Sequence, residues 1–249
     1  MSVWFVVGIV FAVVVAGATL QRISGMGMGL LAAPVLALVM GPIVGIMVVN
    51  ILAAINALVN SFSAHPHVDW RRFWLIGPVM VLGALPAVYL VENMPVAWLQ
   101  IFVGTLLVIA LTVVTFGQSR VPVAHGRAPA ITSGIVGGFM NTIAGVAGPA
   151  LTVYAQAARW EQRSFAATLQ PLFVVSGVVS FAAKYFTDAA NISNVPLVIW
   201  PAGLVAMGVG IFTGKYLARK VSRNSARTLA ITVATLGALT AVVRGVLSL

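Results

Sequence analysis

Two short stretches interrupt the apolar sequence with glycine, proline and hydrogen-bonding side chains. Residues 21–34 read QRISGMGMGLLAAP, and residues 141–149 read NTIAGVAGP. Glycine and proline weaken helices, and a helix that starts after such a break has free backbone N–H groups and a positive dipole end. Helix N-termini of this kind bind anions. Both stretches are therefore candidate parts of an anion-binding site.

Side chains beside the two breaks can donate hydrogen bonds to an anion. Arg22 can hold a sulfonate or carboxylate with paired N–H groups, and Asn50 and Gln170 would add neutral donors from the next helix. The predicted substrate-binding residues are Gln21, Arg22, Ser24, Gly25, Gly27, Asn50, Asn141, Thr142, Gly145, Gly148 and Gln170.

Other roles for these residues remain open. Arg22 could instead extend to the inner membrane interface as an orientation signal. The glycines could serve only the close packing of helices, and Asn50 and Gln170 could bond neighbouring helices without touching a substrate. The residues alone do not choose between these roles.

The remaining reactive residues argue against several functions. The chain has no cysteine, and its carboxylates, Asp69, Glu92, Glu161 and Asp188, fall in or beside expected loops. Without a carboxylate in the middle of a span, the usual proton relay or cation site is missing. The sequence HPH (65–67) also lies in an expected loop, and the chain has no H-E-x-x-H motif. We expect no enzyme activity, no metal and no cofactor.

The composition indicates that a membrane surrounds the elements that position these residues. Of the 249 residues, 61% are hydrophobic and 7% charged, whereas soluble domains have about 25% charged residues. A lipid bilayer is crossed by about 20 apolar residues, and comparable runs occur at 3–20, 43–63, 73–91, 98–116, 165–183, 195–214 and 228–243. We predict an all-α polytopic membrane protein. Its net charge of +10 lies in short loops, as the positive-inside rule requires, so we expect no nucleic-acid binding.

The distribution of loop charge predicts the topology. Basic residues cluster between most spans, whereas the loops 92–97 and 187–194 contain none. Basic loops face the cytoplasm, and all of them do so only if residues 130–158 enter the membrane and return to the same side. This segment is predicted to be a helical hairpin that bends near Gly145–Gly148, and whether it crosses fully or is re-entrant stays open. Both termini are then expected on the outer, non-cytoplasmic side of the cell (inner) membrane.

A weak internal repeat relates the two breaks. At an offset of 120, residues 17–31 lie over residues 137–151, and Asn50 falls opposite Gln170. If residues 3–41 form a hairpin like 130–158, each half has five segments. After an odd number of segments the chain is on the opposite side of the membrane, so the second half has the inverted orientation.

We therefore predict two inverted-topology repeats within one membrane domain. Each repeat opens with a Gly/Pro-broken hairpin, which three transmembrane helices follow. Residues 1–118 form the first repeat, 119–128 a cytoplasmic linker and 129–249 the second repeat. Inverted repeats are typical of secondary transporters, whose substrate site lies near the midplane at discontinuous helices.

Four stretches resemble the TauE/SafE family of anion permeases, also called sulfite exporters: 21–42, 137–157, HVDWRRF (67–73) and RSFAATLQPLF (163–173). The resemblance covers essentially the whole chain. It implies transport of sulfite, thiosulfate, a sulfonate or sulfoacetate across the bacterial inner membrane. Many members have a G-x-G-G-G run where this chain has Gly25-Met26-Gly27-Met28-Gly29, a departure that bears on pocket size and substrate.

The predicted function is that of a secondary transporter for a small anion. We expect a sulfur-containing anion to cross the cytoplasmic membrane by alternating access around a central site between the two repeats. The alternatives are a passive anion channel and a transporter of a non-sulfur organic carboxylate. The expected partners are the anionic substrate and the lipid bilayer, and a homo-oligomer is left open. The direction of transport and the coupling ion are also open.

Overall fold

The structure, a computed structural model, describes residues 2–116, 122–187, 189 and 195–249. All regular secondary structure in these residues is helical. Part of the predicted linker 119–128 and most of the loop 187–194 lie outside the described residues. The helices are α1 (Val3–Ser24), α2 (Met28–Met40), α3 (Pro42–Ala64), the 3-10 turn η1 (His65–His67), α4 (Trp70–Ile76), α5 (Met80–Asn93), α6 (Val96–Phe116), α7 (Ala128–Ala144), α8 (Gly148–Ala157), α9 (Gln162–Phe186), α10 (Ile199–Leu217) and α11 (Arg223–Leu247).

Six helical segments in the described part of the chain are long and apolar enough to cross a membrane. They are Val3–Ser24, Pro42–His67, Trp70–Asn93, Val96–Phe116, Gln162–Phe186 and Arg223–Leu247. Helix α10 covers most of the predicted run 195–214 and packs along α1, although it is not among these six. The all-α polytopic membrane architecture predicted from the sequence is confirmed at this level.

Glycine ends the first helix of each broken segment. Gly25 follows α1 with φ 86° and Gly145 follows α7 with φ 71°, both in the left-handed region. This conformation suits glycine, and it lets the N–H of the glycine bond the carbonyl of the residue four positions earlier, Gln21 or Asn141 respectively. The chain therefore reverses direction after each glycine.

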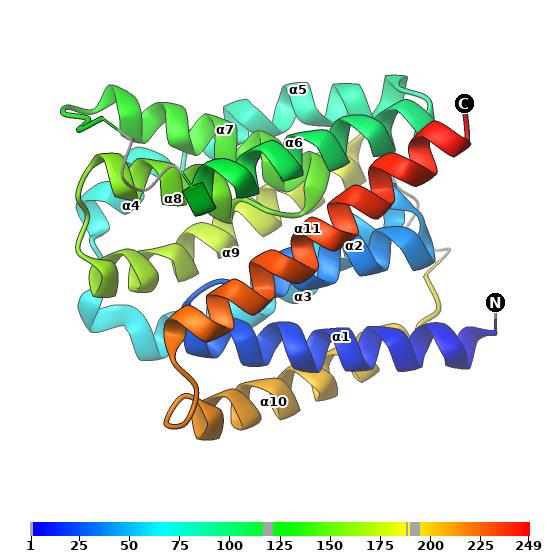
Figure 1. Cartoon of the computed structure of the whole chain (residues 1–249), viewed down its shortest axis with the longest axis horizontal. Coiled ribbons are helices and arrows are strands. Elements are labelled where there is room, and N and C mark those ends of the chain that lie inside the picture. Colours follow the sequence, from blue (N-terminus) through cyan, green and yellow to red (C-terminus); the bar gives the residue numbers. More distant parts are fainter. Residues whose placement is uncertain (1, 117–121, 188, 190–194) are drawn as a thin grey trace.

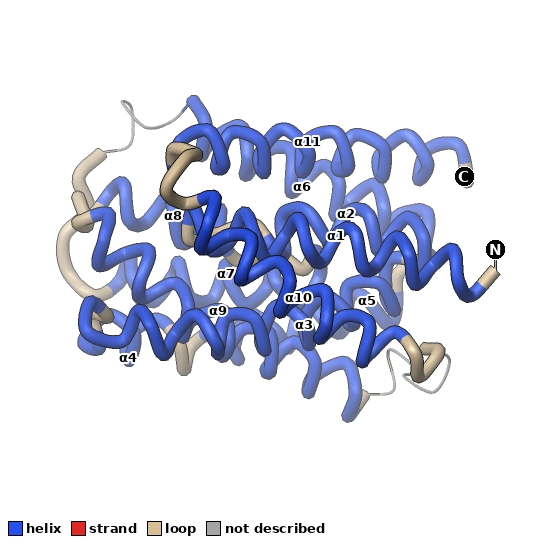
Figure 2. Tube along the Cα trace, turned by 90° about the horizontal axis from the view of Figure 1, so that it is seen from below, coloured by secondary structure: helices blue, strands red, loops and turns tan. Residues whose placement is uncertain are grey.

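The two hairpins that result open toward opposite ends of the molecule. Both chain termini lie at one end (Figures 1 and 2), and the α1–α2 hairpin opens toward that end. The α7–α8 hairpin opens toward the other end, where α4, the start of α9 and the start of α11 also lie (Figure 1). The return arms α2 and α8 have 13 and 10 residues, fewer than the roughly 20 that cross a bilayer. Each return arm therefore has one end in the interior of the molecule.

Small residues allow the long helices to pack closely around the hairpins. Helix α1 packs on α10, α3 on α9, α5 on α7, and α6 on α11. A Cβ atom on Gly138 would collide with the Met80 carbonyl, and one on Gly104 with the Ala238 carbonyl. Glycine permits this approach of helices in membrane proteins. The close packing holds both hairpins inside the helical bundle.

Candidate functional site

The turns of the two hairpins meet in the interior. A Cβ atom on Gly29 would collide with the Gly145 carbonyl, and one on Gly145 would lie 2.9 Å from the Ala33 Cβ. The N-termini of α2 and α8 lie directly after these turns. Two helix ends that favour negative charge are therefore brought together by glycine contacts that a larger residue would prevent.

An amide pair fastens the first turn to α9. Gln21 Nε2 donates to Gln170 Oε1 at 3.0 Å, and Gln170 Nε2 donates to the Gly25 carbonyl at 2.9 Å. The Met28 N–H, at the start of α2, donates to Gln21 Oε1 at 3.3 Å. Both glutamines are buried. This Gln21–Gln170 pair therefore bonds two backbone groups at the helix break, the Gly25 carbonyl and the Met28 N–H. It also keeps amide donors near the start of α2.

A second amide pair joins α7 to α3 and α9. Asn141 Nδ2 donates to Asn50 Oδ1 at 3.2 Å and to Ser180 Oγ at 2.9 Å, and the hydroxyls of Thr142 and Ser180 bond at 2.8 Å. All four residues are buried. The Asn50 Nδ2 group makes no hydrogen bond with the described residues, so one amide donor of this Asn50–Asn141 pair is unused.

A small cavity of about 30 Å³ borders both amide pairs and both hairpin turns. It has room for about two water molecules, fewer heavy atoms than a sulfur oxyanion contains. Its wall includes Met26 and Phe173 in addition to amides and glycines. We call this space the central cavity, and it is closed to an anion in this conformation.

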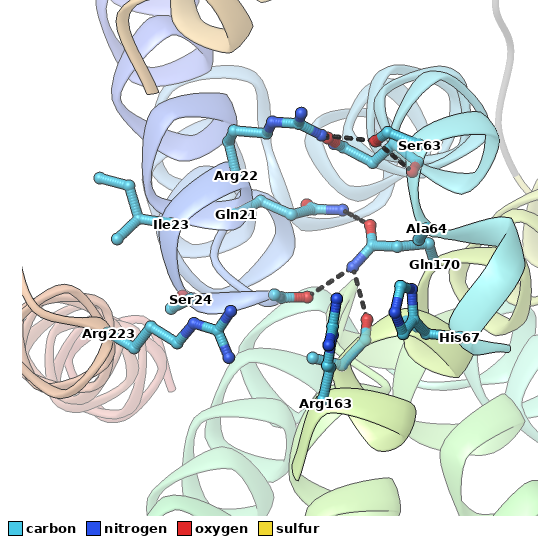
Figure 3. Close-up of a pocket in the computed structure, with 14 residues that line it drawn as sticks. Gln21, Arg22, Ile23, Ser24, Ser63, Ala64, His67, Arg163, Gln170 and Arg223 are labelled. Carbon is cyan, nitrogen blue, oxygen red and sulfur yellow. Dashed lines mark hydrogen bonds between the residues drawn. The ribbon is translucent and has the colours of Figure 1, made fainter. Parts of the chain in front are cut away.

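A larger cavity of about 270 Å³ lies on the other side of the Gln21–Gln170 pair and is the basic vestibule. Arg163, Arg223 and His67 point toward a common space in it (Figure 3). None of the described residues in its wall is acidic. The wall consists of Gln21, Arg22, Ile23, Ser24, Gly25, Asn60, Ser63, Ala64, His67, Arg163, Ala166, Ala167, Gln170 and Arg223. Such a wall attracts anions and repels cations.

Arg22 belongs to the wall of the vestibule. Its Nη1 donates to Asn60 Oδ1 at 3.0 Å and to Ser63 Oγ at 2.7 Å (Figure 3). The side chain is half-buried and does not line the central cavity. Arg22 therefore lies in the wall of the vestibule next to the Gln21–Gln170 pair.

The family model of the sulfite exporter TauE/SafE matches residues 9–243. The match includes the second hairpin, the first hairpin from residue 9 onward, both amide pairs and the whole wall of the vestibule. This chain belongs to the TauE/SafE family. Comparison with curated proteins found no match, and comparison with solved structures found none.

Membership in the TauE/SafE family identifies a multi-pass membrane protein of a transporter family rather than an enzyme family, with a small anion as its substrate. The vestibule suits that class because its charged side chains are cationic. Within the described residues, no group of three or more His, Asp or Glu side chains could hold a metal ion.

The structure of this TauE/SafE chain distributes the predicted site residues over two cavities. The central cavity has Gln21, Gly27, Asn50, Asn141, Gly145 and Gly148 in its wall. The vestibule has Gln21, Arg22, Ser24, Gly25 and Gln170. Thr142 lines neither cavity, because its hydroxyl is buried against Ser180. Only Gln21 borders both, so it lies where a path between the two cavities would pass.

Sequence reasoning missed two basic residues of the vestibule, Arg163 and Arg223, and assigned their charge to loops. Both lie in the first turn of a helix, α9 or α11, where the helix dipole disfavours a cation. An arginine in the first turn of a helix is therefore a sequence feature that could have pointed to these two residues. At the start of α9, Glu161 accepts from the backbone N–H groups of Arg163 and Ser164, which lowers the pKa of Glu161 and keeps the carboxylate bound to the backbone.

Proposed function

We propose that this TauE/SafE chain is a secondary transporter that moves a small sulfur-containing anion across the cytoplasmic membrane by alternating access. Sulfite, thiosulfate, a sulfonate and sulfoacetate are the candidate substrates. The observation that carries the proposal is the closed central cavity, which has an amide pair on either side and a basic vestibule beyond one of them.

The two halves of the chain, residues 1–118 and 129–249, are proposed to be inverted repeats joined by a cytoplasmic linker at 119–128. A shift of 120 residues carries the Gln21–Gln170 pair onto the Asn141–Asn50 pair. The same shift carries the contact between Arg22 and Asn60 onto that between Thr142 and Ser180. Agreement of two interhelical contacts is stronger support than sequence identity in apolar segments.

Helix packing and hairpin direction also support inverted repeats. Helix α1 packs on α10 as α7 packs on α5, and α2 packs on α11 as α8 packs on α6. The hairpins open toward opposite ends (Figure 1). With the basic end in the cytoplasm, as the positive-inside rule requires, both termini would lie outside the inner membrane.

In the proposed cycle, the vestibule concentrates the anion and Arg22 binds it. The anion then replaces the hydrogen bonds within the Gln21–Gln170 pair and reaches the N-termini of α2 and α8, where Gly25, Gly27, Gly145 and Gly148 allow close backbone approach. Ser24 supports the first turn, since its hydroxyl lies within hydrogen-bonding distance of the Met26 carbonyl in that turn. Opening of the Asn50–Asn141 pair, with Thr142 behind it, would release the anion on the other side.

A passive anion channel, the alternative, would need a continuous open path when it conducts, and the central cavity does not provide one in this conformation. The cationic wall accepts a non-sulfur organic carboxylate as readily as a sulfonate, since arginine binds both with paired N–H groups. Flux assays separate these options: saturation and counter-exchange indicate a carrier, and competition within a panel of sulfur oxyanions, sulfonates and carboxylates ranks the substrates.

The decisive experiment is transport by Arg22→Ala in proteoliposomes. Loss of a charge-assisted hydrogen bond costs about 1.5–3 kcal/mol, so we expect roughly 10- to 100-fold weaker anion binding. Arg71→Ala is the matched control, because Arg71 is exposed at the same end and lines neither cavity. Sulfite and sulfonate transport that is unchanged in Arg22→Ala would refute the assigned site.

A further inference from the structure

A second polar cavity, of about 410 Å³, lies between α8 and the N-terminal part of α11. It is at the same end of the molecule as the vestibule but shares none of its wall residues. Gln156 of α8, Arg159 and Trp160 of the following turn, and Arg227 of α11 line it. We call it the α8–α11 cavity.

The Arg227 guanidinium in this cavity has no counter-charge in the described part of the chain. Its Nε and Nη2 atoms are buried and make no hydrogen bond there, and the same is true of Gln156 Oε1. None of the described residues in the wall is acidic. Arginine stays charged in proteins, and burying part of its guanidinium without a partner is costly. An external anion would remove that cost.

The second cation, Arg159, is held in an unusual backbone conformation. Its φ is 49°, and it is the one non-glycine residue in the described chain with a positive φ. Glycine or asparagine commonly takes this left-handed position after a helix. Strained backbone of this kind clusters at functional sites. Here the strained position places an arginine in the wall of a cavity that already holds an unpaired guanidinium.

We propose that the α8–α11 cavity binds a phosphate-type oxyanion between Arg159 and Arg227. Arginine pairs with such groups through two parallel N–H donors, and a protonated oxygen of the anion would donate to Gln156 Oε1. The same chemistry is offered by inorganic phosphate from the aqueous phase and by the headgroup of phosphatidic acid.

A bound oxyanion would also touch the moving parts of the proposed transporter. Met26, at the turn of the first hairpin, lines both this cavity and the central cavity. Gln156 belongs to the return arm of the second hairpin, and Arg227 belongs to α11. The occupant therefore bridges both hairpins and α11. Binding itself does not depend on the proposed transport function.

Thermal unfolding of the purified full-length protein in detergent tests the proposal, with inorganic phosphate and dihexanoyl phosphatidic acid as separate probes. We expect one or both probes to raise the Tm of the wild type and of Arg71→Gln. Arg159→Gln/Arg227→Gln should need at least tenfold more probe for the same rise. A response to phosphate identifies an aqueous anion as a sufficient ligand, and a response to phosphatidic acid alone identifies the lipid.

The vestibule could also bind these probes, so Arg163→Gln/Arg223→Gln is measured in parallel. We expect this variant to keep most of the wild-type response, with a loss smaller than that of Arg159→Gln/Arg227→Gln. A response that is lost in this variant but kept in Arg159→Gln/Arg227→Gln overturns the proposal, as does a response that is equal in all variants or absent from the wild type.

Two single variants show whether a weaker response comes from lost anion binding or from misfolding. Arg159→Gly relieves the positive φ, so its Tm without anion should rise while its response to the probe weakens. Arg227→Gln should be at least as stable as the wild type without anion, because it removes an uncompensated charge. A lower Tm of Arg227→Gln in anion-free buffer would mean that Arg227 has a partner within the protein, and would overturn the proposal.

Discussion

The two amide pairs beside the central cavity have similar chemistry but different surroundings. The Gln21–Gln170 pair borders the basic vestibule, whereas the Asn50–Asn141 pair lies among the buried hydroxyls of Thr142 and Ser180. The position of Arg22 in the first half is taken by Thr142 in the second. In the proposed cycle, this difference makes the Gln21–Gln170 pair the side that is open to the vestibule and the Asn50–Asn141 pair the closed side.

A buried lysine is a further difference between the two halves. The shift of 120 residues carries Ala64, in the wall of the vestibule, onto Lys184. Lys184 is 1% exposed, and its Nζ makes no hydrogen bond with the described residues. A charged group inside a membrane domain is costly unless it is paired or hydrated. We expect Lys184 to line a matching outer vestibule when the closed side opens.

The largest effect should come from separating the hairpin turns. Gly29→Val places a side chain against the Gly145 carbonyl, and overpacking of this kind costs about 1–3 kcal/mol or more. We expect loss of transport and a lower Tm. Gly8→Val is the control, because no atom lies within 4 Å of a Cβ added at Gly8. Equal transport by the two variants would show that the turns need not touch.

The two amide pairs should differ in their contribution to stability. Asn141→Ala leaves the Asn50 side chain without a partner in a closed cluster and leaves Ser180 bonded to Thr142 alone, which costs about 1–3 kcal/mol of unfolding free energy. Gln21→Ala should cost less, because water from the vestibule can replace its hydrogen bonds. Denaturation in detergent measures both. A greater loss in Gln21→Ala would reverse the assignment of open and closed sides.

Accessibility can test whether the closed side opens during transport. The chain has no native cysteine, so Ser63→Cys and Ser180→Cys are single reactive sites. Ser63 is exposed and Ser180 is fully buried. We expect a water-soluble maleimide to label Ser63→Cys at least roughly tenfold faster in the empty protein, since burial blocks access to the thiolate. Saturating substrate should accelerate labelling of Ser180→Cys; protection that never changes would contradict alternating access.

The smallest effect is expected from the outer edge of the vestibule. Arg223 is exposed, so its charge should mainly steer the anion, and Arg223→Gln should slow uptake only a few-fold. This difference should shrink as ionic strength rises, because the Debye length falls from about 10 Å at 0.1 M to about 3 Å at 1 M. Initial rates in low and high salt provide the measurement. A defect independent of salt would point to direct contact with the substrate.

The sequence was sufficient to predict the local features of the site. Glycine and proline determine where helices break, so Gly25, Gly145 and the short return arms α2 and α8 were predictable. Charge parity likewise indicated a hairpin at 130–158, because a single crossing would put basic loops on both sides. The offset of 120 relates Gln21 to Asn141 and Asn50 to Gln170 from the sequence alone.

Only the tertiary structure decided which side chains meet. Gln21 and Gln170 are 149 residues apart, and their contact depends on how α1 and α9 pack through other helices. The same holds for the direction of Arg22, for Arg163 and Arg223 in the vestibule, and for Arg227 in the α8–α11 cavity. Loop charge assigns a basic residue to one end of the molecule. The cavity that it faces depends on helix rotation and packing, which short-range sequence patterns do not specify.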